Sequence, residues 1–322
     1  MVLAVPEQGV TDLPPFHRLS FTAMGTTCQV DFACDSEARA RDFKGAVQAW
    51  VESFEARFSR FRPDSLISRL NAGAGGEGVE LDEEGESLVG LIDWYHWSTG
   101  GVFDPSALPL LSLWDYHQPE PRIPSAAAIR EALERVGWKK VIHRNKTLRL
   151  PEPGMGVDVG GIGKEYAVDI VLQMGEARGF PSVHVNFGND LRVAGPAPQG
   201  GPWLVGLEDP RQPGTCWGGL GVTRHAVTTS GDYRRFFTAE GRRFGHILDP
   251  RTGWPVANGC QSVTVVAPTC TEAGILSTTA FILGADEGVR FIRNWHQAEG
   301  CLWQADRLIQ TEGFGHYVCT AR

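Results

Sequence analysis

The sequence lacks a long apolar run, and no stretch approaches the ~18–20 residues that a membrane helix needs. Its first 16 residues, MVLAVPEQGVTDLPPF, lack the charged segment followed by an apolar segment that marks a secretory signal. Internal repeats are also lacking, which argues against a solenoid. We therefore expect a chain with no membrane span and a cytoplasmic location. An exported form stays open, because a signal could have been removed.

The sequence also lacks closely spaced cysteine pairs and an excess of basic residues. The seven cysteines are odd in number, scattered and never spaced C-x-x-C, which argues against a disulfide scaffold or a zinc site and favours reduced thiols. The formal net charge of -8 argues against a general binder of phosphate backbones, so we expect no nucleic-acid partner.

What the chain does have is enough apolar material for a large core. It has 322 residues, 42% of them hydrophobic, with 10 Trp and 16 Phe. This length suits one large domain over residues 1–322, or two intimately associated lobes. Strands group together rather than alternate strictly with helices. This predicts an α+β fold, in which mixed β-sheets pack with helices.

Residues 157–179, VDVGGIGKEYAVDIVLQMGEARG, have the pattern of a strand, a glycine turn and an amphipathic helix that stops at Gly179. The helix start would offer free N–H groups to an anion, and Lys164 would add a positive charge. The pattern is neither G-x-G-x-x-G nor a Walker loop, and taken alone it is more often an ordinary strand-to-helix turn.

Three further segments carry polar side chains where chemistry is feasible. Residues 185–195 predict a hairpin whose turn ends at Asp190. Residues 226–237 predict a strand that ends in hydroxyl side chains. The helical segment 269–284 carries Thr278, which shares a face with position 274 because the two are four residues apart. Each has an ordinary structural explanation too.

The segment GHILDPRTGWPV, residues 245–256, places a histidine in a stiff loop. Its two prolines fix the backbone, and Asp249 can pair with Arg251 or with backbone N–H groups. His246 would then stand on a rigid platform, which suits a proton acceptor. A structural histidine with a satisfied hydrogen bond is the alternative.

Taken together, these segments resemble the ApbE family, the FAD:protein FMN transferases. The resemblance rests on AMGTTCQV, FSRFRPDSLISRLN, GVFDPSALPLLSLW, VDVGGIGKEYAVD, VNFGNDLRVAG, AVTTSGDYRRFF, GHILDPRTGWPV and ILSTTAFILG, which occur in the family's order. It implies an ApbE-like, T-fold-like architecture. It also implies transfer of FMN from FAD to a threonine or serine hydroxyl of an acceptor protein, with release of AMP and assistance from Mg²⁺.

The resemblance also implies roles for individual residues. His246 would be the base that deprotonates the acceptor hydroxyl. Gly161, through its carbonyl, and Thr278 would bind the metal. The residues that would contact FAD are Met24, Phe61, Val102, Phe103, Asp104, Asp158, Lys164 and Ile247.

The chain departs from the family pattern at two informative positions. The family usually has an aspartate four residues before the metal-binding threonine, but here that position is Gly274. It often has glycine after the lysine, but here that position is Glu165. A lost carboxylate should weaken a Mg²⁺ site. Glu165 would either recruit a cation in place of the missing aspartate or turn outward. Glu272 is the nearest carboxylate in the sequence, but on a helix it points in a different direction from Thr278, which is awkward for binding the same ion. Two other functions therefore stay open: an FAD carrier or chaperone, and an FAD pyrophosphatase.

Overall fold

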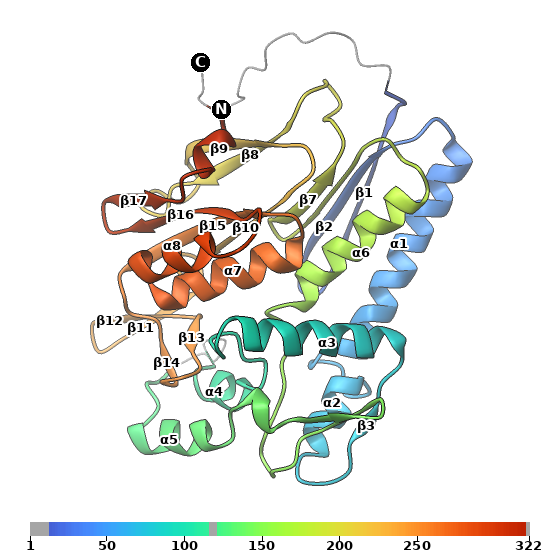
Figure 1. Cartoon of the computed structure of the whole chain (residues 1–322). Helices are drawn as coiled ribbons and strands as arrows, with labels where there is room; N and C mark the ends of the chain where they lie inside the picture. Colours follow the sequence, from blue (N-terminus) through green and yellow to red (C-terminus); the bar gives the residue numbers. More distant parts are fainter. Residues whose placement is uncertain (1–12, 116–120, 320–322) are drawn as a thin grey trace.

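The protein is built around an antiparallel sheet of eight strands. The structure, a computed structural model, describes residues 13–115 and 121–319 (Figure 1). The strands follow one another in chain order, with further elements inserted after the second, fourth, fifth and sixth. They are β1 (Phe16–Ala23), β2 (Thr26–Ala33), β6 (Val183–Phe187), β7 (Asp190–Ala194), β10 (Ala226–Gly231), β15 (Cys260–Ala267), β16 (Glu299–Gln304) and β17 (Arg307–Gln310).

Helices cover one face of this sheet, and a small sheet covers the other. Side chains alternate between the faces along a strand, so Val265 packs with the helices while Val266 packs with the small sheet. Figure 1 shows the four helices on the near side of the sheet. These helices are α1 (Glu37–Phe58), α6 (Gly163–Ala177), α7 (Cys270–Leu283) and α8 (Ala285–Arg293). The small sheet contains β8 (Trp203–Glu208), β9 (Cys216–Val222) and β18 (Val318–Cys319), and the 3₁₀ turn η2 (Phe314–His316) precedes β18.

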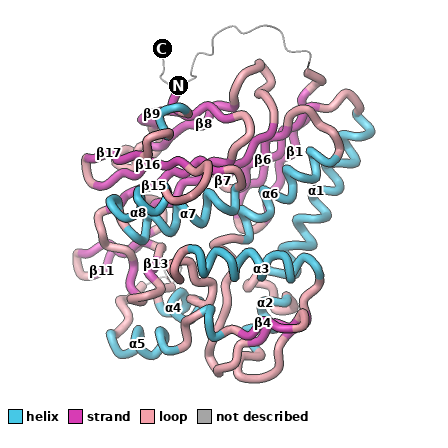
Figure 2. The backbone as a smooth tube through the Cα atoms, in the orientation of Figure 1, coloured by secondary structure: helices cyan, strands magenta, loops and turns pink. Residues whose placement is uncertain are grey.

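A second part lies below the helices and consists mainly of helix and loop (Figure 2). Its apolar cluster includes Ile92 but also Phe54, Tyr166 and Ile275 from the helices that cover the sheet. The two parts therefore share buried side chains. The elements of the second part are α2 (Leu66–Ala72), β3 (Val79–Glu80), α3 (Glu83–Ser98), α4 (Leu108–Leu113), α5 (Ala126–Glu134), η1 (Trp138–Lys140), β4 (Ile142–Arg144) and β5 (Thr147–Arg149).

Two short hairpins connect the sheet to this second part. They are β11 (Phe236–Ala239) with β12 (Arg242–Gly245), and β13 (Leu248–Asp249) with β14 (Trp254–Pro255). Phe244 and Leu248 pack against Leu110, Trp114 and Ile129 of the α4–α5 region. This packing fixes the loop that contains His246.

The predicted α+β class is confirmed, and several local predictions hold. The strand expected at 27–34 is β2, and the helix expected from Ser36 is α1, whose N-cap is the Ser36 hydroxyl accepting from the Arg39 N–H. The hairpin expected at 185–195 is β6 and β7, and its turn residues Gly188 and Asn189 both have positive φ.

The strand predicted at the start of 157–179 is wrong. The helix forms as α6, but the residues before it join no sheet, apart from an isolated bridge between Ala107 and Gly156. The Asn71 side chain takes the place of a strand neighbour: its Oδ1 accepts from the Val157 N–H at 2.7 Å and its Nδ2 donates to the Val157 carbonyl at 2.9 Å. The sequence pattern correctly indicates an extended segment, but the backbone N–H and carbonyl of Val157 bond to one side chain instead of to a neighbouring strand.

We expect Asn71→Ala to lower the free energy of unfolding by ~1–3 kcal/mol, because it leaves two backbone groups of Val157 without their partner. Urea unfolding of the variant beside wild type measures this change. Asn294→Ala, at an exposed helix end, is the control and should stay within ~0.5 kcal/mol. Equal effects of the two substitutions would show that Asn71 does not hold the segment.

The cysteine prediction is confirmed: all seven are free thiols, and Cys28, Cys34, Cys260, Cys270 and Cys301 are buried. Within residues 13–115 and 121–319, no helix combines the length and the apolar character needed to cross a membrane. The predicted lack of an export signal falls largely on residues 1–12, which lie outside the described residues. The cytoplasmic location stays a prediction.

Candidate functional site

His246 lies between β12 and β13 and is anchored through its own ring. Its backbone N–H donates to the Arg235 carbonyl at 3.1 Å, and its Nδ1 lies 3.2 Å from the same oxygen. A carbonyl only accepts, so Nδ1 carries the proton and Nε2 carries a lone pair in the neutral ring. Burial, helped by the positive charge of Arg235, lowers the pKa of His246 to about 4. The imidazole is therefore neutral near pH 7, and Nε2 is its basic nitrogen.

The loop after His246 is as stiff as the sequence predicts. Asp249 accepts from the Arg251 N–H at 2.9 Å and pairs with the guanidinium at 2.8 Å, so both predicted partners are present. Gly253 has a φ of +75°, and a Cβ there would lie 2.7 Å from Ile129. The Trp114 indole donates to the Gly253 carbonyl at 2.8 Å. These contacts tie the loop to α4 and α5.

The lowered pKa of His246 makes stability depend on pH. The unfolded imidazole takes a proton near pH 6.5, the folded one only near pH 4, so stability is full above pH 6.5 and falls as the pH drops towards 4. We expect the stability advantage of wild type over His246→Gln to shrink by ~1–3 kcal/mol across this range. Urea unfolding at pH 7 and pH 4.5 tests it; two parallel pH profiles would contradict the shift.

A cluster of charges lies at the start of α6. Lys164 pairs with Asp190, the residue after the β6–β7 turn, and its Nζ lies 3.3 Å from Glu165 Oε1. The Glu165 side chain points inward, since the residue is only 8% exposed. Its Oε2 is buried and has no hydrogen-bond partner in the part of the chain that the structure describes. A buried carboxylate oxygen without a partner costs free energy, and a bound cation or hydrogen-bond donor would offset that cost.

Glu165 lies directly against α7. A Cβ built on Gly274 would lie 2.6 Å from Glu165 Cγ and 3.4 Å from Oε1. Gly274 is therefore the residue that leaves room for the carboxylate. Figure 1 shows α6 and α7 side by side above α3.

Hydroxyl groups from two elements meet one turn further along α7. Ser230 Oγ, at the end of β10, lies 2.9 Å from Thr278 Oγ1 and 2.8 Å from Ser277 Oγ. The sequence showed these hydroxyls in two separate segments, and the fold joins them. Within the described ranges no three His, Cys, Asp or Glu side chains form a metal-binding group. A cation here would need hydroxyl and carbonyl oxygens as well.

Arg60, which the sequence reasoning missed, contacts two of the residues predicted to bind FAD, Phe61 and Asp158. Its guanidinium lies 4.1 Å from the centre of the Phe61 ring, and its Nε donates to Asp158 Oδ2 at 2.9 Å. Asp158 Oδ1 accepts from the Gly160 N–H at 2.9 Å. Arg60 thus joins the exposed Phe61 ring to the glycine turn before α6. The sequence signal that could have identified Arg60 is its position in FSRF, where a cation lies between two aromatic residues.

The predicted flavin residues fall into two groups. Val102 and Ile247 are buried in the cluster under the helices, and Met24 packs against it from the β1–β2 turn. The Met24 N–H donates to Glu55 Oε2 at 3.1 Å, which fixes this turn. Phe103 lies near Gly161 instead, with its Cε2 3.8 Å from a Cβ built there.

Asp104 faces the protein interior. Its Oδ1 accepts from the Ser106 N–H and hydroxyl, at 2.9 and 2.5 Å, and its Oδ2 accepts from the Trp138 N–H at 3.0 Å. Both oxygens of the carboxylate therefore make hydrogen bonds that stabilise the loop after Phe103.

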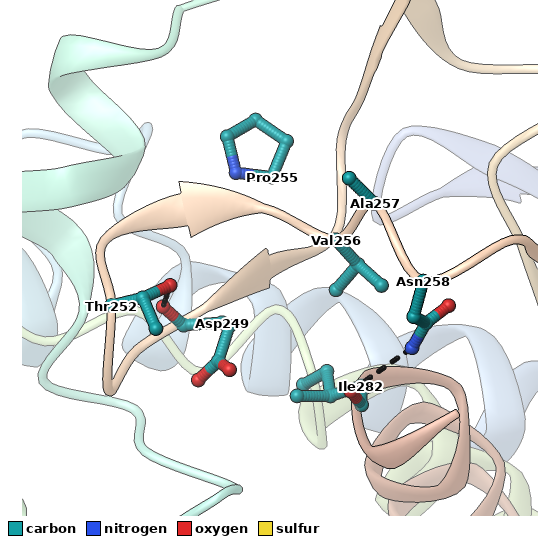
Figure 3. A pocket seen from close by; sticks show the side chains of 7 residues that line it. All are labelled: Asp249, Thr252, Pro255, Val256, Ala257, Asn258 and Ile282. Carbon is teal, nitrogen blue, oxygen red and sulfur yellow. Dashed lines mark hydrogen bonds between the residues drawn. The ribbon is translucent and has the colours of Figure 1, made fainter.

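Two surface hollows lie near these groups. One, of about 240 Å³, is lined partly by Asp249, Thr252, Pro255 and Val256 of the 245–256 loop. It is also lined by Asn258, whose side chain donates to the backbone of α7 (Figure 3). The other, of about 590 Å³, is lined by Trp94, Trp295 and Glu272, and burial raises the pKa of that glutamate. Neither contains a residue predicted to contact the flavin.

Comparison with known proteins gives one consistent result. The model of the ApbE family matches residues 24–302 of this chain. A protein from Haemophilus influenzae named FAD:protein FMN transferase is 30% identical over 283 residues, which are 84% of this chain and 82% of that protein.

The solved structures agree with the sequence matches. The ApbE protein from Thermotoga maritima superposes with a TM-score of 0.86 at 31% identity, over 94% of this chain and 99% of its own. A flavin transferase ApbE from Vibrio cholerae superposes with a TM-score of 0.84 at 26% identity, over 94% of this chain and 99% of its own.

Proposed function

The chain belongs to the ApbE family, and on that basis we propose that it moves FMN from FAD to a serine or threonine hydroxyl of an acceptor protein, releasing AMP. The observation that carries this proposal is the ring of His246, whose Nδ1 is held by the Arg235 carbonyl. That bond leaves Nε2 as the acceptor, in a loop too stiff to move it aside.

In the proposed reaction, the acceptor oxygen attacks the phosphorus on the FMN side of the phosphoanhydride. A new O–P bond forms, the P–O–P bond breaks, and AMP leaves with its phosphate. His246 Nε2 takes the proton of the attacking hydroxyl. Such a transfer needs mainly positioning and neutralised charge. A bound pyrophosphate would also raise the pKa of His246 from its low value, because a nearby anion favours the charged imidazole.

We assign FAD contacts on the family resemblance together with the placement just described. The exposed Phe61 ring and the Met24 turn suit an isoalloxazine, and Lys164 suits a phosphate. Asp104 would act by shaping the loop that presents Phe103. The full set of proposed FAD residues is Met24, Phe61, Val102, Phe103, Asp104, Asp158, Lys164 and Ile247. Because the two parts of the molecule share one buried cluster, we propose that they work as a single unit.

The residues present fit a Mg²⁺ ion. The hydroxyl of Thr278 and the carbonyl of Gly161 are hard oxygen ligands, and the Glu165 oxygen that finds no partner among the described residues would add negative charge. When bound, Mg²⁺ neutralises charge on the pyrophosphate.

The experiment is an incubation of purified protein with FAD, MgCl₂ and a threonine-containing acceptor peptide, followed by mass spectrometry and chromatography of AMP. A peptide heavier by FMN less water, with equal AMP, supports the transferase. AMP without peptide modification would indicate a pyrophosphatase. Retained FAD with neither product would indicate a carrier, and either result would overturn the proposal.

A further inference from the structure

Glu165 is a buried acid that takes no proton and contacts no part of FAD in the proposed transfer. Its residue is 8% exposed, one carboxylate oxygen lies 3.3 Å from Lys164 Nζ, and no described residue donates a hydrogen bond to the other. Lys164 also pairs with Asp190. The three groups carry two formal negative charges and one positive charge. The cluster therefore has one surplus negative charge in a place that water does not reach freely, which a cation would offset.

The position of this surplus charge is set by Gly274. A Cβ at 274 would come within 2.6 Å of Glu165 Cγ, closer than side-chain atoms approach, so any side chain at 274 would displace Glu165. Thr278 lies one helical turn after Gly274 on the same face of α7. Gly161 lies four residues before Glu165, is exposed, and has only Phe103 near the place a Cβ would take. Glu165 therefore lies against α7 at Gly274, with the Thr278 hydroxyl one helical turn further along α7 and the Gly161 carbonyl in the turn before α6.

We infer that Glu165 is the carboxylate ligand of the Mg²⁺ site in this chain, and that Gly274 is glycine because it makes room for that ligand. The carboxylate is supplied from α6, across the interface, instead of from α7 itself. This inference rests on the proposed function, since the cation is the one that transfer would use.

The test uses full-length variants and direct metal binding. Glu165→Gln keeps the shape and removes the charge. Glu165→Gly with Gly274→Asp moves the carboxylate from α6 to α7, and Gly274→Asp alone places two carboxylates in one space. Glu176→Gln, an exposed glutamate on the same helix, is the matched control. Binding of MgCl₂ and MnCl₂ is measured by calorimetry, and thermal unfolding is measured with and without Mg²⁺, each with and without FAD.

We expect Glu165→Gln to weaken Mg²⁺ binding by at least ~10- to 100-fold, the loss that removal of a mere supporting group already causes. Without metal, the same variant should melt ~2–4 °C above wild type, because it removes a charge without a full set of partners. With Mg²⁺ this order should reverse. The double variant should bind within ~10-fold of wild type, and Gly274→Asp alone should melt at a lower temperature than both wild type and the double variant.

Equal Mg²⁺ affinity of wild type and Glu165→Gln would overturn the inference, as would a wild type that binds no Mg²⁺. A folded double variant without recovered affinity would also contradict it. If the double variant does not fold, the inference is still tested by whether Mg²⁺ reverses the order of the melting temperatures of wild type and Glu165→Gln. Failure of the proposed function looks different: wild type would release no AMP from FAD, while the metal titrations without FAD would still report on Glu165.

Discussion

Replacing His246 by alanine is expected to lower the rate of FMN transfer by ~10²–10⁴-fold while leaving the affinity for FAD within about threefold. The alanine removes the only atom assigned to accept the hydroxyl proton. It leaves the loop intact, because Asp249, Arg251 and Gly253 hold that loop through their own contacts. The rate should therefore fall in the chemical step and not in binding.

Transfer is followed as FMN-modified peptide per unit time, and FAD binding by calorimetry on the same samples. His296→Ala, an exposed histidine near the end of α8, is the matched control and should keep the wild-type rate. Equal rates in wild type and His246→Ala would remove His246 from the mechanism. Loss of FAD affinity with an unchanged rate at saturation would make it a binding residue instead.

The largest effect on stability is expected from Asp169→Ala, which should cost ~3–5 kcal/mol. Asp169 is a buried carboxylate on α6 that accepts from the first N–H groups of α7, at 2.8 Å from Cys270 and 2.9 Å from Thr271, and from the Thr271 hydroxyl at 2.7 Å. It also pairs with Arg192 at 2.9 Å. Alanine would leave a guanidinium and a helix start without partners in the interior.

Urea unfolding measures this loss, and Glu176→Ala on the exposed side of α6 should change stability by less than ~0.5 kcal/mol. The double variant Asp169→Ala with Arg192→Leu should be less destabilised than Asp169→Ala alone, because it leaves no unpaired cation. A single variant as stable as the control would show that the α6–α7 interface does not depend on this carboxylate. Because that interface also contains Gly274 and Glu165, the single variant should weaken Mg²⁺ binding too.

The sequence predicted those parts of the molecule that depend on near neighbours. The cap at Ser36, the β6–β7 turn and the Asp249–Arg251 pair all involve residues within a few positions of one another. Each is set by local backbone preference and short-range hydrogen bonds. The family resemblance then supplied the fold as a whole.

What the sequence could not predict are contacts between distant residues. Asn71 holds Val157 from 86 positions away, and Arg60 reaches Asp158 across 98 positions. A local pattern of extended residues predicts a strand in either case, because it does not reveal whether another strand or an amide side chain takes the backbone hydrogen bonds. Likewise, Gly274 and Glu165 are each visible as departures from the family, but only the fold shows that they touch. Asp169 had a signal that was overlooked, an acid on the buried face of an amphipathic helix.

The central claim is that this chain holds FAD with its phosphoanhydride facing His246. The most direct test is a crystal structure of the His246→Ala variant with FAD and MgCl₂, since that variant should keep the dinucleotide intact. We expect the isoalloxazine to lie beside Met24, Phe61 and Phe103, and the two phosphates between the start of α6 and the loop of residues 245–256. Intact FAD bound elsewhere, or phosphates directed away from residue 246, would contradict it.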